Sequence, residues 1–210
     1  RYICNDLKKT SKSLNGRILV LTGARQTGKT TIAKTLFEDY EYLSIEDPVL
    51  SQALSQLSSK QWKTNYPKAV LDEVQKTPNL IRSIKSVYDQ WDEPRYILLG
   101  SSQLLLLKNV KESLAGRCVI KEMYPLTLPE LRTNSFDDLV DESILQKVLI
   151  NGEVFPLLPS FVLDSKHAEK MNAWNHYLKF GGYPALVNEE RSTKDKYEWL
   201  AGYVRTYLER

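Results

Sequence analysis

The feature that most constrains this chain is a glycine motif at residues 23–30, Gly-Ala-Arg-Gln-Thr-Gly-Lys-Thr. It matches the phosphate-loop pattern G-x4-G-K-[ST] at every fixed position. A short apolar run, residues 17–22, comes directly before the motif, and a helical apolar pattern over 30–37 follows it. Glycines let consecutive backbone N–H groups fold around an anion, and the start of the next helix adds positive potential. The motif therefore predicts a strand, a phosphate-binding turn and a helix in that order.

Each position of this loop has an expected role. Lys29 is expected to contact the β- and γ-phosphates, and the Thr30 hydroxyl to bind Mg²⁺. Arg25 is expected to brace the loop or face solvent. An ordinary glycine-rich turn is a remote alternative, because the motif lies between a strand and a helix. The residues expected to bind nucleotide are Gly23, Ala24, Arg25, Gln26, Thr27, Gly28, Lys29, Thr30 and Thr31.

Two adjacent carboxylates follow a second apolar run. Residues 68–71 predict a buried strand that delivers Asp72 and Glu73 at its carboxyl end, the edge where open α/β sheets bind ligands. Asp72 is expected to hold Mg²⁺ with Thr30, and Glu73 to activate a water as general base. A strand that simply ends in a charged turn is the alternative, which the preceding phosphate loop disfavours.

Two further residues have both a catalytic and a structural interpretation. Ser101 follows a strand at 96–99 and either orients the attacking water or caps a helix. Arg117 precedes a strand at 118–120 and either stabilises charge on the γ-phosphate or is a surface arginine. An arginine of this kind could also act on the nucleotide of a neighbouring subunit.

The order of apolar runs predicts the architecture. Strands at 17–22, 40–45, 68–71, 96–99 and 118–120 alternate with helices, which indicates a parallel α/β sheet covered on both faces. After Pro125 the pattern becomes helical, with helices expected from Thr127, around 138–149, over 166–180 and at the end of the chain. We therefore expect an α/β core at 1–125 and a helical region at 126–210. The last apolar stripe continues to the final residues, so a further domain is expected beyond Arg210.

Composition adds weaker constraints. The 29 Lys and Arg against 26 Asp and Glu give a net charge of +3, too small to indicate nucleic-acid binding by itself. Cys4 and Cys118 fit no metal or disulfide spacing. We found no leader peptide or membrane span, so a cytoplasmic protein without a membrane partner is expected.

Several motifs together resemble a known family. They are Gly-x-Arg-Gln-x-Gly-Lys-Thr at 23–30, Leu-Asp-Glu-Val-Gln at 71–75, Leu-Leu-Gly-Ser-Ser at 98–102, Leu-Ala-Gly-Arg at 114–117, Tyr-Pro-Leu at 124–126 with Glu130, and Gly-Gly-Tyr-Pro at 181–184. The set resembles a group of predicted AAA-superfamily ATPases of bacteria and archaea. The resemblance implies a P-loop core with strand order 5-1-4-3-2, a helical lid, and a C-terminal region that includes a winged helix and a nuclease-like domain.

The functional prediction is Mg²⁺-dependent ATP binding and hydrolysis that drives movement of the helical lid. ATP rather than GTP follows from the resemblance, and no guanine-reading Asn-Lys-x-Asp motif is present. A homo-oligomer, and DNA contact through a further C-terminal region, are additional expectations. Two alternatives stay open: a nucleotide-binding switch or scaffold with negligible hydrolysis, and a small-molecule phosphotransferase.

Overall fold

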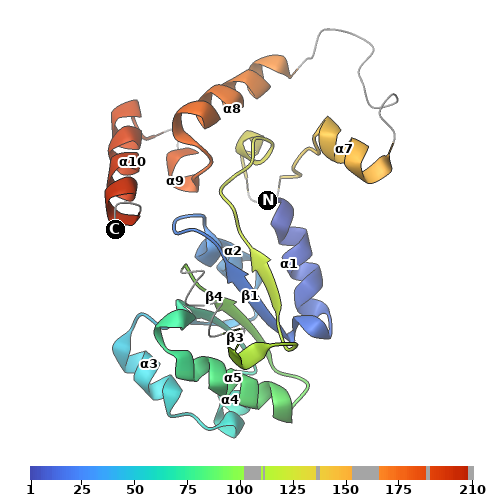
Figure 1. Ribbon diagram of the computed structural model, residues 1–210, viewed down its shortest axis with the longest axis vertical. Helices are drawn as coiled ribbons and strands as arrows, with labels where there is room; N and C mark the ends of the chain where they lie inside the picture. Colours follow the sequence, from blue (N-terminus) through green and yellow to red (C-terminus); the bar gives the residue numbers. More distant parts are fainter. Residues whose placement is uncertain (102–109, 111, 136–137, 153–165, 188–189, 208–210) are drawn as a thin grey trace. The chain divides into compact units, whose positions relative to one another are not determined.

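The structure, a computed structural model, describes residues 1–101, 110, 112–135, 138–152, 166–187 and 190–207 (Figure 1). By its internal contacts the chain divides into two units. The core unit is Ile3–Tyr124, and the helical unit is residues 125–210 together with Arg1 and Tyr2. Among the described residues, no helix combines the length and the apolar character that crossing a membrane requires.

The core unit is built on a five-stranded parallel sheet. The strands are β1 (Ile18–Thr22), β2 (Glu41–Ser44), β3 (Lys68–Asp72), β4 (Arg95–Leu99) and β5 (Val119–Glu122). Their order in space is β2-β3-β4-β1-β5. The predicted α/β fold and the predicted order 5-1-4-3-2, counted from the other edge, are confirmed. All five residues of β1 are buried, as expected for a central strand covered on both faces.

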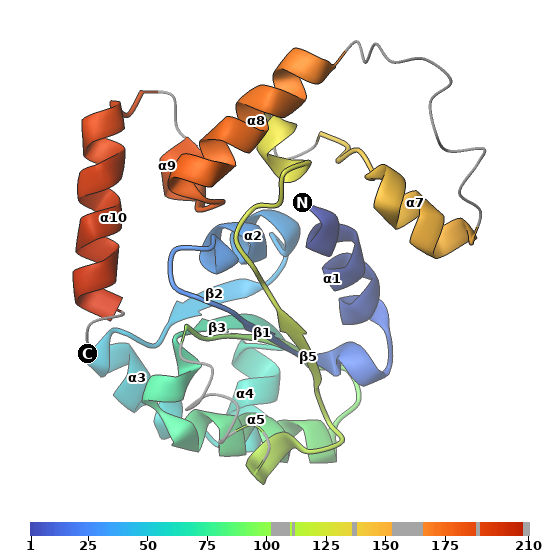
Figure 2. The same cartoon turned by 45° about the horizontal axis from the view of Figure 1, so that its top comes forward.

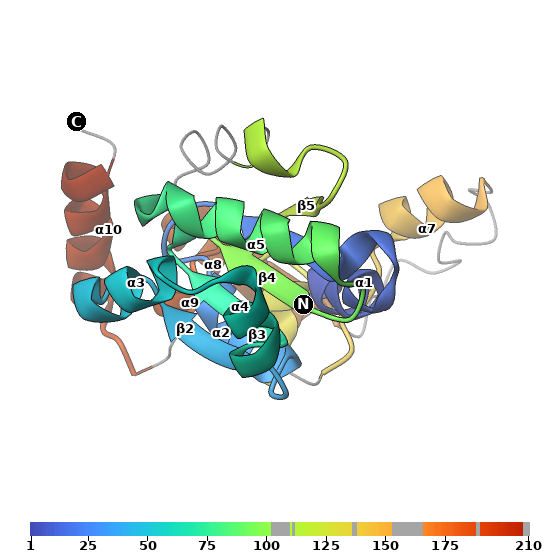
Figure 3. The same ribbon diagram turned by 90° about the horizontal axis from the view of Figure 1, so that it is seen from below.

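Helices cover both faces of this sheet. Alternate residues of each strand point to opposite faces, and Ile18 and Val20 join one core cluster with α3 (Pro48–Ser55), α4 (Ser59–Asn65) and α5 (Pro78–Gln90). Leu19 and Leu21 are buried toward the other face, which carries α2 (Lys29–Leu36). Figures 2 and 3 show α2 and α5 on opposite sides of the sheet. The parallel strands therefore all bring their carboxyl ends to the edge where α2 begins.

Two helices of the core unit were missed by the sequence analysis. The first, α1 (Tyr2–Lys12), buries Cys4 and Leu7. The second, α4, begins at a reciprocal capping box between Ser58 and Gln61 and buries Trp62 completely. Trp62 is the single apolar residue of α4, so that helix has no apolar period, whereas the buried residues Cys4, Leu7 and Ser11 of α1 do lie at helical spacing.

The helical unit differs from expectation at its start. The described elements are η3 (Glu130–Arg132), α7 (Ile144–Asn151), α8 (His167–Phe180), α9 (Pro184–Val187) and α10 (Thr193–Tyr207). The helix expected from Thr127 is only the 3₁₀ turn η3, although the Glu130 carboxylate does accept the Thr127 backbone N–H at 2.8 Å. The helix expected around 138–149 begins later, because Asp138 binds the backbone N–H groups of Asn134 and Ser135 in a turn. Its capping box is Ser143 with Gln146.

Candidate functional site

The phosphate loop joins β1 to α2 and is tightly folded. Gly23 has φ 142° and Gly28 has φ 92°, both in the region that favours glycine. A Cβ at Gly23 would lie 2.1 Å from the Met123 carbonyl oxygen, so only glycine fits there. Thr27 is fully buried, and its hydroxyl donates to the Ala24 carbonyl oxygen at 2.9 Å. The loop therefore holds its curled shape through its own contacts.

Lys29 is the buried cation of this loop. Its side chain is 7% exposed, and Nζ donates to the carbonyl oxygens of Gly23 (3.0 Å) and Ala24 (2.8 Å). Burial lowers the pKa of Lys29, and the nearby carboxylates of Glu73 and Asp72 oppose that shift. A buried ammonium group with only neutral loop partners is well suited to bind a phosphate.

Asp72, at the end of β3, connects the loop helix to the acidic pair. Its Oδ2 accepts hydrogen bonds from the Thr30 hydroxyl at 2.6 Å and the Tyr42 hydroxyl at 2.7 Å. Its Oδ1 accepts the Glu73 backbone N–H at 2.9 Å. Hard oxygen donors of this kind are the ligands Mg²⁺ prefers, and the contact between Thr30 and Asp72 brings two of them together. The residues present therefore fit a magnesium ion.

Glu73 has an unusual backbone conformation. Its φ of 58° and ψ of 36° are left-handed, which for a residue with a Cβ costs on the order of 1 kcal/mol. Its Oε2 accepts hydrogen bonds from the Ser101 hydroxyl at 3.0 Å and from Gln75 Nε2. Within the described part of the chain, no hydrogen bond is made to Oε1. One oxygen is thus anchored and the other is available.

Two residues of this site, Tyr42 and Gln75, were not assigned a role from the sequence. Tyr42 lies on β2, next to β3, and its pKa is raised by burial and by the hydrogen bond to Asp72. The ammonium nitrogen of Lys34 lies over the Tyr42 ring, 3.9 Å from its centre, in a cation–π contact. Tyr42 belongs to an apolar run, so nothing distinguished it locally from a core residue. Gln75 does lie in one of the shared motifs, which was the available signal.

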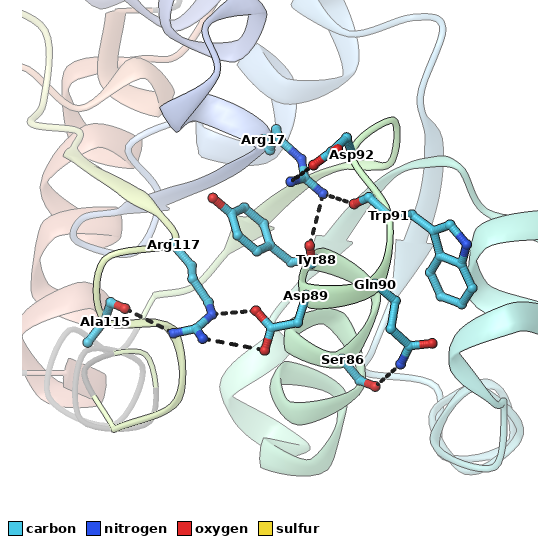
Figure 4. Close-up of polar contacts among 9 residues, drawn as sticks. All are labelled: Arg17, Ser86, Tyr88, Asp89, Gln90, Trp91, Asp92, Ala115 and Arg117. Carbon is cyan, nitrogen blue, oxygen red and sulfur yellow. Dashed lines mark hydrogen bonds and ion pairs between the residues drawn. The ribbon is translucent and has the colours of Figure 1, made fainter.

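Arg117 has different neighbours from the rest of the predicted site (Figure 4). Its guanidinium pairs with Asp89 on α5, at 2.6 Å from Nε to Oδ1 and 3.4 Å from Nη2 to Oδ2. Nη1 also donates to the Ala115 carbonyl oxygen at 3.3 Å. Neither partner belongs to the phosphate loop or the acidic pair. The structure thus brings together Lys29, Thr30, Asp72, Glu73 and Ser101 but does not bring Arg117 to them.

Comparison with known proteins identifies the family. A family profile described as an AAA domain matches residues 15–132, more than half of the chain. This chain belongs to the AAA family. It is grouped with the P-loop ATPases of the AAA superfamily, as the motifs predicted, and membership of this family supports nucleotide binding.

Two curated relatives of this chain are described as uncharacterised proteins. The AAA chain is 28% identical to an uncharacterised protein of Methanocaldococcus jannaschii over 95% of its length, and 26% identical to one of Mycobacterium tuberculosis over 92%. It spans 44% and 35% of the lengths of these two proteins.

A solved structure has the same fold. The Walker-type ATPase of Pyrococcus abyssi matches with a TM-score of 0.58 at 14% identity, over 97% of this chain and 73% of that one. At this identity the likeness concerns the fold alone.

Proposed function

We propose that this protein binds Mg²⁺-ATP at the loop 23–31 and hydrolyses it. The hydrogen bond between Thr30 and Asp72 carries the proposal. It joins the phosphate loop to the carboxylate that precedes Glu73, so the anion-binding, metal-binding and base functions come within one hydrogen-bonded unit.

The loop residues would bind and orient the triphosphate. Backbone N–H groups of the loop and of the start of α2 would donate to phosphate oxygens, and Lys29 would exchange its carbonyl partners for phosphate. Thr30 and Asp72 would hold Mg²⁺, which when bound offsets the negative charge of the phosphates. Tyr42 keeps the Asp72 carboxylate oriented by donating to its Oδ2.

Glu73 would act as the general base. Ser101 and Gln75 anchor Oε2, so Oε1 is the atom that would accept a proton from the attacking water. On this proposal Ser101 positions the base rather than contacting phosphate. The left-handed backbone at Glu73 is the kind of local strain that recurs at active sites.

The test is phosphate release by the full-length protein and its Glu73→Gln variant. We expect hydrolysis to fall by ~10²-fold or more with ATP affinity unchanged, because the amide keeps the shape but not the base. Glu41→Gln is the matched control, because Glu41 is an exposed carboxylate at the amino end of β2, away from the phosphate loop. Lys29→Ala should weaken or abolish ATP binding itself.

Three outcomes would redirect this proposal. Turnover below about one per minute that Glu73→Gln leaves unchanged would favour the nucleotide-binding switch or scaffold. ATP consumption without free phosphate would favour the phosphotransferase. ATP affinity unchanged in Lys29→Ala would contradict the phosphate site.

We also propose that hydrolysis moves the helical region 126–210 as a lid and requires a homo-oligomer in which Arg117 acts across subunits. In that case Arg117 must exchange Asp89 for the neighbour's nucleotide. Lys29→Ala and Arg117→Ala proteins, each inactive alone, should regain activity when mixed. A folded mixture that stays inactive excludes action across subunits, and an active Arg117→Ala protein removes Arg117 from the mechanism.

DNA contact and a cytoplasmic location stay predictions.

A further inference from the structure

A cavity of the core unit lies at the opposite end of the strands from the phosphate loop. Its volume is about 460 Å³, and it is lined by residues that begin β3 and β4 and by the ends of α1 and α2. We call it the basal pocket. Lys68 and Arg95 are the first residues of β3 and β4, whereas Asp72 is the last residue of β3. At ~3.3 Å per residue, the two sites are about 13 Å apart along this strand.

The lining of the basal pocket is strongly cationic. It contains Lys8, Lys12, Lys68 and Arg95 against the single carboxylate of Asp39, a net charge of 4 − 1 = +3. That equals the net charge of the whole chain, 29 − 26 = +3. The lining therefore carries a local excess of positive charge.

The one carboxylate is already engaged. Asp39 binds Lys68 at 2.6 Å, and this hydrogen bond lowers the pKa of Asp39, so it stays ionised near neutral pH. Lys8 and Lys12 form no salt bridge with any described residue. The acidic neighbours Glu38 and Glu41 are exposed and do not line the pocket. Two lysines are thus available to an anion.

The third available cation is held in place. Arg95 Nη1 donates to the carbonyl oxygens of Ser11, in the last turn of α1, at 2.7 Å and of Ser13, just beyond the helix, at 3.1 Å. A pre-positioned guanidinium loses little side-chain entropy when it binds an anion. The carboxyl end of α1 accounts for a lysine in its last turn and for Arg95, which binds carbonyl oxygens there, but not for Lys68 at the start of β3.

The remaining wall is apolar and aromatic. Phe37 is buried, Tyr40 is half-buried, and their ring centres lie 5.3 Å apart. Cavities of ~300–1,000 Å³ with an apolar wall and a few convergent polar groups are typical of small-molecule sites. A ligand that fits has an anionic group for the cations and an apolar or planar part for the rings.

We propose that the basal pocket binds a small phosphorylated molecule, with its phosphate between Lys8, Lys12 and Arg95. This site is separate from the ATP site and does not depend on the proposed hydrolysis. Phosphate is favoured because it accepts several charge-assisted hydrogen bonds at once, which three convergent cations supply.

The test uses the full-length Lys29→Ala protein, in which the loop cation is absent, titrated calorimetrically with inorganic pyrophosphate. Lys12→Ala in this background should weaken binding at least ~10-fold, because a charge-assisted contact is lost. Lys9→Ala is the matched control: Lys9 and Lys12 both lie in the last turn of α1, but only Lys12 lines the pocket. Lys9→Ala should change the affinity by less than about twofold.

Each contrary result has a definite meaning. No pyrophosphate binding in the Lys29→Ala protein, or equal losses in the two lysine variants, would overturn the proposal. If a short DNA strand binds through Lys12 while pyrophosphate does not, the pocket is a nucleic-acid contact and the small-ligand proposal is wrong. Failure of ATP hydrolysis would leave this result unaffected.

Discussion

Two helices that carry an apolar stripe, α5 in the core unit and α10 in the helical unit, have different surroundings. Along its 13 residues α5 buries Leu80, Ile81, Ile84 and Val87. The 15 residues of α10 include none that is buried. The aromatic rings of α10 contact one another, with Trp199 and Tyr203 stacked at 5.2 Å, and also contact the rings of Phe180 and Tyr183. An apolar stripe predicts a helix in both cases, but only a packed partner turns the stripe into burial.

The same contrast extends to the two units. The core cluster joins side chains from the four strands β1 to β4 with those of α3, α4 and α5. In the helical unit, Leu145 and Leu149 of α7 are 67% and 75% exposed. We infer that burial stabilises the core unit, whereas caps, turns and ring contacts contribute more to the helical unit.

The largest expected effect comes from two tryptophans. Trp62→Ala in the core should destabilise the protein by ~3–5 kcal/mol, because Trp62 is fully buried against Tyr66 and Tyr96. Trp174→Ala on α8, where the side chain is 45% exposed, should cost less than about 1 kcal/mol. Urea denaturation measures the free energy of unfolding of both variants. Equal losses would contradict the difference between the core unit and the helical unit.

The next largest effect on stability is expected at two glycines that lie in close contact with backbone carbonyl groups. A Cβ at Gly23 would lie 2.1 Å from the Met123 oxygen, and one at Gly182 would lie 2.0 Å from the Leu126 oxygen. Gly23→Ala should destabilise the core by ~1–3 kcal/mol and abolish ATP binding. Gly182→Ala should make the helical unit more sensitive to protease and leave ATP affinity unchanged. Loss of ATP affinity in Gly182→Ala would show that the units are coupled.

A pair of tyrosines tests the site more finely. Tyr42→Phe removes one hydroxyl donor from Asp72 and should weaken ATP binding in the presence of Mg²⁺ by about fivefold, the value of one hydrogen bond. Binding without Mg²⁺ should not change. Tyr197→Phe, on exposed α10, is the control and should change neither affinity. If Tyr42→Phe weakens binding equally without Mg²⁺, Tyr42 supports the fold rather than the metal site.

The smallest change in stability is expected at two apolar side chains, one in each unit, that are exposed to the same degree. Val49 of α3 and Leu149 of α7 are 77% and 75% exposed. Val49→Gln and Leu149→Gln should both change the free energy of unfolding by less than ~0.5 kcal/mol. If Leu149→Gln lowers the free energy of unfolding of the full-length protein by more than this, the Leu149 side chain is buried in that protein.

Local sequence patterns were sufficient for most of the core. The five strands lie within two residues of the predicted runs, because each is a short apolar segment next to a turn or charged residue. The helix expected around 138–149 was misplaced because Asp138 caps a turn rather than a helix, and sequence alone does not distinguish the two roles. Residues 102–109, where a helix after Ser102 was expected, lie outside the described part.

The sequence by itself determined the phosphate loop, the alternation of strands and helices, and the position of the acidic pair after β3. These depend on backbone preferences and apolar periods that act over a few neighbouring residues. Only the tertiary structure decided that Tyr42 donates to Asp72, that Ser101 and Gln75 anchor one oxygen of Glu73, and that Arg117 pairs with Asp89. It also placed Lys12 and Arg95, far apart in the chain, around one cavity. Such contacts depend on which strands become neighbours in the sheet, and that follows from packing of the whole core rather than from any local pattern.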